Sequence, residues 1–91
     1  MNPSPPRLVK RAMPKYPEGE RQSYADGSVS IYAVIAKDGV PQQFQIVSGS
    51  TPGFDKASLD AVQLWRYEPA RCDYAPVDVE AVLTVNYSLT P

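Results

Sequence analysis

Apolar and β-branched residues fill the segment Ser28–Ala36, "SVSIYAVIA", almost without interruption. On an extended chain, odd and even positions point to opposite faces, and here both faces are apolar: Val29, Ile31, Ala33 and Ile35 on one, Tyr32, Val34 and Ala36 on the other. A strand that is apolar on both faces is typical of the centre of a sheet. The pattern therefore predicts a central strand.

A β-hairpin is predicted directly after this strand. The segment Lys37–Val40 contains Asp38-Gly39, a strong short-range signal for a hairpin turn. The return segment Gln42–Ser48 places Phe44 and Ile46 on one face, against Gln43, Gln45 and Val47 on the other. Strict alternation of this kind is typical of a strand with one buried face.

The hydrophobic period then changes to that of a helix. Thr51-Pro52-Gly53 interrupts the strand, and an apolar stripe follows at helical spacing, formed by Phe54, Ala57, Ala61, Leu64 and Trp65 and widened by Leu59 and Val62. The stripe predicts a helix over residues 55–65 that packs on one face of the sheet. We expect Pro69 to end it, because a residue before proline avoids the α region.

A second long strand is predicted at the end of the chain, over Val77–Leu89. Its odd-numbered positions are mainly apolar and its even-numbered positions mainly polar, which fits an edge strand with one wet face. A short helix is expected over Glu18–Ala25, with Pro17 at its first position. Asp26-Gly27 is a turn signal that closes this segment.

Together these elements predict an α+β fold: a three-stranded antiparallel sheet in the spatial order second, first, third (2-1-3), with two helices on one face. The outer edge of the last strand would be free. Prolines are concentrated in residues 1–17, so residues 1–13 are interpreted as a proline-rich linker remnant and residues 14–91 as one domain.

The charge balance argues against a nucleic-acid partner. The chain has 91 residues, nine Lys and Arg against ten Asp and Glu, and a net charge of −1, whereas nucleic-acid binders carry a basic stripe. Arg7, Lys10, Arg11 and Lys15 cluster near the start, and we interpret them as part of a solvated tail.

The sequence offers little for catalysis, a disulfide or a metal. Cys72 is the single cysteine and there is no histidine, so Cys72 is interpreted as a semi-buried side chain in a loop. Asp55 and Asp60 have no histidine, metal-ligand pattern or glycine loop with them, so we expect neither enzymatic activity nor a cofactor. No stretch is long and apolar enough to span a membrane, and Met1–Lys15 lacks the apolar centre of a signal peptide.

The segment "WRYEP" contains the chain's one tryptophan. Trp65 lies on the apolar stripe and is interpreted as a core residue that closes the helix, and Tyr67 as structural. Arg66 either pairs with Asp78 or Glu80 or stays solvated. For Tyr16, packing and partner contact both remain open.

Several of these motifs occur together in a known family. Tyr16-Pro17, Gly27-Ser28-Val29, Asp38-Gly39, the helix Phe54–Val62 and "WRYEPA" (Trp65–Ala70) follow one another in the order of the C-terminal domain of the TonB family. The chain resembles that domain from Pro14 to Leu89. Many members have Gln-Pro-x-Tyr-Pro where this chain has Met13-Pro14-Lys15-Tyr16-Pro17.

The resemblance implies energy transduction across the periplasm of Gram-negative bacteria. Members are anchored in the inner membrane by an N-terminal helix and driven by a proton-motive-force complex of the ExbB/ExbD type. A proline-rich spacer crosses the periplasm, and the C-terminal domain binds the TonB box of an outer-membrane transporter. It follows from the resemblance that this domain is periplasmic and that the membrane anchor lies outside this chain.

The resemblance also implies a partner-binding strand. An exposed strand edge offers unpaired backbone groups to an incoming extended peptide. The family's contact strand maps onto Val79, Glu80, Ala81, Val82, Leu83, Thr84, Val85, Asn86 and Tyr87, with Tyr16 and Pro17 beside it. The alternative is a self-associating scaffold module of the cell envelope with the same fold, TolA-like or a strand-exchanged homodimer.

Overall fold

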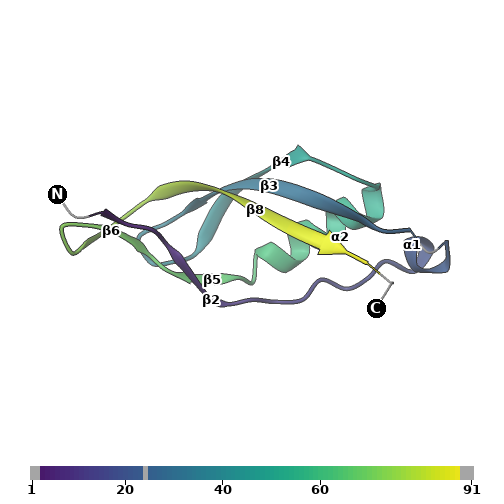
Figure 1. The fold of residues 1–91 in the computed structure, drawn as a ribbon, viewed down its shortest axis with the longest axis horizontal. Coiled ribbons are helices and arrows are strands. Elements are labelled where there is room, and N and C mark those ends of the chain that lie inside the picture. Colours follow the sequence, from purple (N-terminus) through teal and green to yellow (C-terminus); the bar gives the residue numbers. More distant parts are fainter. Residues whose placement is uncertain (1–2, 24, 89–91) are drawn as a thin grey trace.

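The computed structural model describes residues 3–23 and 25–88 and shows an elongated α+β domain with extents of 50 × 24 × 17 Å (Figure 1). The helices and strands are, in chain order, β1 (Pro3–Ser4), β2 (Arg7–Lys10), α1 (Glu18–Gln22), β3 (Gly27–Ile35), β4 (Pro41–Ser48), α2 (Pro52–Val62), β5 (Arg66–Glu68), β6 (Ala70–Cys72), β7 (Ala75–Val77) and β8 (Val79–Tyr87).

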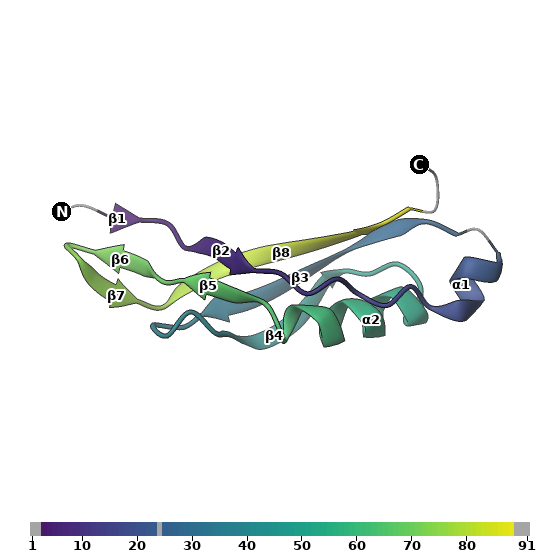
Figure 2. The same ribbon diagram turned by 90° about the horizontal axis from the view of Figure 1, so that it is seen from below.

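The main sheet has the predicted topology. Its order is β4-β3-β8, and both pairings are antiparallel, which confirms the 2-1-3 arrangement. Helix α2 lies along one face of this sheet, and α1 lies beyond the N-terminal end of α2 (Figure 2). The Thr51 hydroxyl donates a hydrogen bond to the Glu20 carboxylate over 2.9 Å, which joins the two helices at that end.

The core lies between the main sheet and α2. The four odd-numbered β3 residues from Val29 to Ile35 are fully buried, as the sequence predicted, and Leu83, Val85 and Tyr87 of β8 are at most 5% exposed. Tyr32 and Val34, on the other face of β3, are only partly buried. Leu89, expected on the buried face of the last strand, lies outside the described residues.

The turn after β3 is longer than a two-residue hairpin. Residues 36–40 connect β3 to β4, and Gly39 has a φ of 83°. The Gly39 carbonyl accepts a hydrogen bond from the Tyr67 N–H over 2.9 Å. A glycine is needed here, because a Cβ at position 39 would lie 1.9 Å from the Tyr67 carbonyl oxygen.

Helix α2 is shifted relative to its prediction. It starts at Pro52, with Thr51 as the N-cap accepting a hydrogen bond from the Phe54 N–H (3.1 Å), and it ends at Val62. Pro69 therefore does not end it, and Leu64, placed on the apolar stripe, is 57% exposed. The chain turns after the helix, and Arg66–Glu68 pairs as β5 with the distant strand β2.

The remaining strands form an arm, defined here as β1, β2, β5, β6 and β7. They build the small sheets β2-β5 and β1-β6-β7 at the end of the long axis opposite α1 (Figures 1 and 2). Residues 70–76 were predicted as a loop and instead form the β6–β7 hairpin, so Cys72 lies on a strand. The last strand, predicted as continuous from Val77, is interrupted at Asp78, whose Oδ1 accepts a hydrogen bond from the Lys37 N–H (2.9 Å).

The segment before β3 also differs from expectation. Arg7, Lys10, Arg11 and Lys15 are exposed as predicted, but the backbone of β2 pairs with β5. Pro17 is the N-cap of α1, one position earlier than expected, and α1 ends at Gln22. The domain boundary after residue 13 stays a prediction.

Candidate functional site: the outer edge of β8

Strand β8 is an edge of the main sheet. It pairs with β3 over nine consecutive residues without a register shift, and no other strand among residues 3–23 and 25–88 pairs with it. An edge strand presents a row of unpaired N–H and C=O groups. Within the described residues, the outer edge of β8 is therefore unpaired along its whole length.

Two hydrogen bonds at the end of β3 fix which β8 groups point outward. The Ala36 N–H donates to the Val40 carbonyl on the β4 side, and the Lys37 N–H donates to Asp78 on the β8 side. Backbone groups of successive strand residues point to opposite sides, so those of Ile35 point toward β8 and form a hydrogen-bonded pair with its partner Val79.

The alternation continues along β8. The backbone groups of Val79, Ala81, Leu83, Val85 and Tyr87 point toward β3. Those of the four intervening residues point outward: Glu80, Val82, Thr84 and Asn86. The predicted contact residues thus divide into one set that holds the sheet and one set whose backbone is available to a partner.

The opposite edge of the sheet, on β4, is irregular. Its pairing with β3 has two register shifts, Gln43 has a φ of 57°, and Pro41 has no N–H to donate. Bulges and prolines are the features that blunt a strand edge against pairing. Only the β8 edge of the main sheet is regular in the described chain.

The side chains of the outward set lie on the uncovered face of the sheet. Val82 is 60% exposed and lies opposite Tyr32 of β3. Burial raises the pKa of Tyr32, and the neighbouring Glu80 carboxylate raises this pKa further. This face therefore combines an apolar strip with one carboxylate beside the open edge.

Tyr16 lies at the end of β8 and is used inside the domain. Its ring makes edge contacts with the rings of Phe54 and Tyr87, at centroid distances of 5.4 and 5.6 Å, and its hydroxyl donates to the Ala25 carbonyl. Packing is thus the role the structure shows for Tyr16. A partner contact by Tyr16 or Pro17 stays a prediction.

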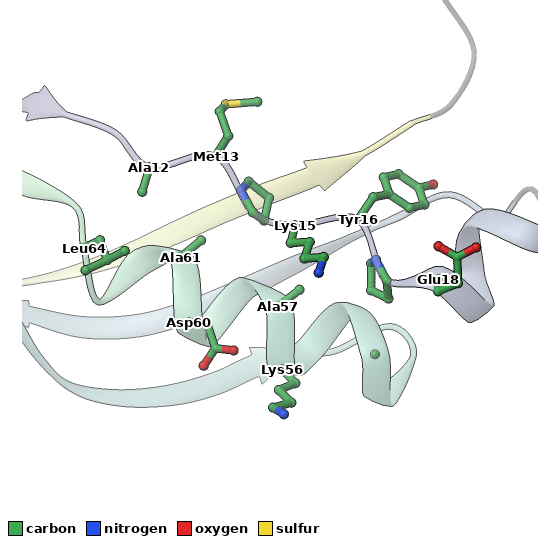
Figure 3. Close-up of a pocket in the computed structure, with 13 residues that line it drawn as sticks. Ala12, Met13, Lys15, Tyr16, Glu18, Lys56, Ala57, Asp60, Ala61 and Leu64 are labelled. Carbon is green, nitrogen blue, oxygen red and sulfur yellow. The ribbon is translucent and has the colours of Figure 1, made fainter.

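A cavity of about 490 Å³ separates the segment that contains Tyr16 from α2. It is lined by residues 12–18 on one side and by α2 and Leu64 on the other (Figure 3). Lys15 and Lys56 are matched there by Glu18 and Asp60, so the cavity has no net charge that would select a charged ligand.

The segment around Trp65 is structural. Trp65 is 4% exposed and belongs to the core, as predicted. The Arg66 guanidinium donates to the carbonyls of Gln63 and Trp65 at 2.9 and 2.7 Å. The predicted pairing of Arg66 with Asp78 or Glu80 is wrong, because no ion pair joins these side chains in the part of the chain that the structure describes, and the guanidinium is held instead at the carbonyls that follow α2.

The described residues offer neither a metal-binding cluster nor a helix that could span a membrane. Those residues contain no group of three or more His, Cys, Asp or Glu side chains with the proximity that a metal ion requires. None of their helices has the length and apolar character that crossing a bilayer requires.

Sequence reasoning located the strand but not its outward-facing groups. Alternation of apolar residues shows which side chains are buried, whereas the direction of the backbone groups depends on pairing with β3. Asp78 belongs to none of the motifs in the sequence, so nothing in the sequence signalled that its carboxylate accepts a hydrogen bond from the Lys37 N–H.

Known proteins resemble this chain in sequence and in fold. Residues 12–89 match the model of the family described as Gram-negative bacterial TonB protein C-terminal. Protein TonB of Escherichia coli K12 is 30% identical over 69 residues, which cover 75% of this chain and 29% of that protein. Protein TonB of Klebsiella pneumoniae is 30% identical over 70 residues, with 76% and 29% covered.

A solved structure shares the fold. The solution NMR structure of the Pseudomonas aeruginosa TonB C-terminal domain superposes with a TM-score of 0.78 at 22% identity, covering 97% of this chain and 90% of that one. The chain spans 29% of the length of the two curated relatives. With the family match extending over most of its residues, this chain belongs to the TonB C-terminal domain family.

Proposed function

We propose that this domain is the periplasmic part of a TonB-like energy transducer, which binds the TonB box of outer-membrane transporters by strand addition at β8. The single observation that carries the proposal is the regular nine-residue edge of β8. The outward backbone groups of Glu80, Val82, Thr84 and Asn86 would pair with the incoming peptide. Main-chain pairing makes small demands on sequence, which suits one transducer that serves several transporters.

The packing supports transmission of force between the segment before α1 and the outer edge of β8. Trp65 and Tyr16 hold the segment before α1 to the core, and the Tyr16 ring contacts Tyr87 at the end of β8. Tension on the N-terminal side would therefore reach the bound peptide through packed side chains. In this proposal an ExbB/ExbD-type inner-membrane complex supplies the force through chain that precedes the domain, and the domain itself performs no catalysis.

The same edge would accept the β8 strand of a second copy. Strand-exchanged or edge-to-edge self-association is therefore the second candidate, and it competes with peptide for identical backbone groups. The two are distinguished by concentration dependence, since self-association grows with protein concentration in the absence of peptide.

Proline scanning of β8, combined with chemical-shift mapping of a TonB-box peptide, tests the proposal. Thr84→Pro removes an outward N–H and should abolish peptide binding while leaving the domain folded. Val85→Pro removes an N–H that pairs with β3 and should destabilise the fold. The matched control Thr84→Ala keeps the N–H and should bind like the parent.

In the parent, peptide-induced shifts should cluster on residues 79–87. The proposal fails if the shifts instead cluster on the exposed face of α2, over Lys56–Gln63, and leave β8 unchanged. It also fails if folded Thr84→Pro binds the peptide as tightly as Thr84→Ala.

A further inference from the structure

The tip of the arm holds a large aromatic side chain in an unfavourable backbone conformation. Asp73 and Tyr74 form the two-residue turn between β6 and β7, with φ values of 51° and 74°. Both central residues of such a turn lie in the left-handed region, where glycine and asparagine are preferred and a bulky residue is strained. Tyr74 is nevertheless 82% exposed, so its ring gains little from packing.

Local contacts do not account for the tyrosine either. The hydrogen bond that supports the turn runs from the Arg71 guanidinium to the Tyr74 carbonyl oxygen, at 3.0 Å. Any residue supplies that carbonyl. A strained, exposed aromatic residue at the tip of a hairpin points to a role outside the fold.

The arm also differs in charge from the rest of the chain. The strands of the arm together with the residues that connect and flank them, 3–11 and 66–78, contain five cationic side chains and three carboxylates, and the Glu68 carboxylate forms an ion pair with Arg7 at 2.7 Å. The other described residues contain four cationic side chains and seven carboxylates. The turn between β6 and β7 lies at one extreme of the 50 Å axis (Figures 1 and 2), and the arm that carries this net positive charge extends to it.

Exposed aliphatic side chains lie on the same arm. Leu8 and Val9 of β2 are 38% and 56% exposed, and they stand between the cationic residues Arg7 and Lys10. Cations interleaved with exposed apolar residues, together with a tyrosine, are typical of surfaces that rest on a membrane interface.

We propose that the arm binds the surface of an anionic lipid bilayer, with Tyr74 entering the interface and Lys10 and Arg71 facing the headgroups. A tyrosine ring suits the interface because its body is apolar and its hydroxyl stays hydrated. A soluble polyanion would use the cations but would gain nothing from Tyr74, Leu8 or Val9. This surface is separate from the β8 edge, so the inference does not depend on peptide binding.

Sedimentation of the 91-residue chain with lipid vesicles tests the proposal. The chain should sediment with vesicles that contain phosphatidylglycerol and should remain in solution with pure phosphatidylcholine. Added salt should release it, because charges on an exposed surface are screened. Failure to sediment, or equal binding to both kinds of vesicle, would overturn the proposal.

Tyr74→Asn separates the aromatic contribution from folding. Asparagine tolerates the left-handed conformation better than tyrosine, so the variant should melt at or above the temperature of the parent. Partitioning onto anionic vesicles should nevertheless fall several-fold. If the variant partitions like the parent, the assignment of Tyr74 and of a bilayer partner is wrong, and a polyanion that contacts only the cations replaces it.

Charge reversal tests the electrostatic contribution with a matched control. Lys10→Glu changes two charges on the arm, each worth about fivefold in partitioning onto an anionic surface, so binding should fall by more than about tenfold. Lys56→Glu makes the same change of charge on the exposed face of α2, away from the arm, and should alter partitioning by less than about twofold. Equal losses in the two variants would show that net charge alone governs binding, which contradicts a specific arm surface.

Discussion

The indole Nε1 of Trp65 donates a hydrogen bond to the Ala12 carbonyl oxygen over 3.0 Å, joining residues 53 positions apart. The Arg11 guanidinium lies 5.3 Å from the centre of the same ring, within the range of a cation–π interaction. One side chain therefore closes the core after α2 and holds the segment that enters the domain from the N-terminal side. Trp65 serves both packing and attachment.

Replacing Trp65 should separate these two roles. Trp65→Ala removes a large buried side chain and should lower the free energy of unfolding by about 3–5 kcal/mol. Trp65→Phe keeps most of the apolar burial but leaves the Ala12 carbonyl without its donor, at a cost of about 1 kcal/mol. Urea denaturation gives both values. A Trp65→Ala protein that melts near the parent temperature and fails only in partner binding would show that Trp65 is a contact residue.

Gly39 should tolerate no side chain. Gly39→Ala places a methyl group against the Tyr67 carbonyl in a left-handed conformation, and the strain alone costs about 1–2 kcal/mol. Gly19→Ala is the control, because nothing lies within 4 Å of the added Cβ and alanine favours helix α1 by about 0.5–1 kcal/mol. Thermal melts should move in opposite directions, and a neutral Gly39→Ala would contradict the close approach of β5 to the turn.

The hydroxyls of Ser58 and Tyr87 form a hydrogen bond in the core at 2.8 Å. Ser58→Ala and Tyr87→Phe should each lower the free energy of unfolding by about 1–3 kcal/mol, because each leaves a buried hydroxyl without this partner. The double variant should cost less than the sum of the two. A double-mutant cycle by urea denaturation measures this coupling, and strict additivity would show that the hydrogen bond contributes nothing.

Alkaline pH should destabilise the domain through its tyrosines. Burial raises the pKa of Tyr87, opposed by the hydrogen bond from Ser58 and reinforced by Asp55, and burial followed by Asp26 and Glu20 raises the pKa of Tyr16. The folded state keeps these phenol protons after the unfolded chain has lost them. The associated stability is therefore complete below pH about 10 and is lost as the pH rises beyond it.

Unfolding experiments at a series of pH values check this expectation by the slope of stability against pH. Tyr87→Phe should flatten the decline above pH about 10, whatever its effect at neutral pH. A decline of unchanged slope in Tyr87→Phe would assign the alkaline loss to other groups.

Local patterns in the sequence determined the main sheet and its covering helix. The run from Val29 to Ile35, apolar on both faces, identifies a central strand, and the alternation up to Tyr87 identifies an edge strand. Both are visible in the sequence because the period of apolar residues is a property of neighbouring positions along the chain. The helical stripe around Phe54 and Ala61 likewise identified α2. The C-terminal end of α2 was not predictable from the sequence. It depends on the pairing of Arg66–Glu68 with β2, a strand remote in sequence.

Only the tertiary structure determined which segments pair as strands of the arm and which backbone groups of β8 point outward. Nothing local distinguishes Arg7–Lys10 from a solvated tail, since its four side chains are exposed and both its backbone pairing and the Arg7–Glu68 ion pair are with β5, a strand remote in sequence. The turn at Asp73 and Tyr74 contains neither glycine nor asparagine, the residues that would have predicted it from the sequence. The choice of Thr84 over Val85 as an outward-facing residue follows from pairing with β3. Side-chain patterns record burial, whereas backbone hydrogen bonding depends on which strands meet, and only the folded chain fixes that.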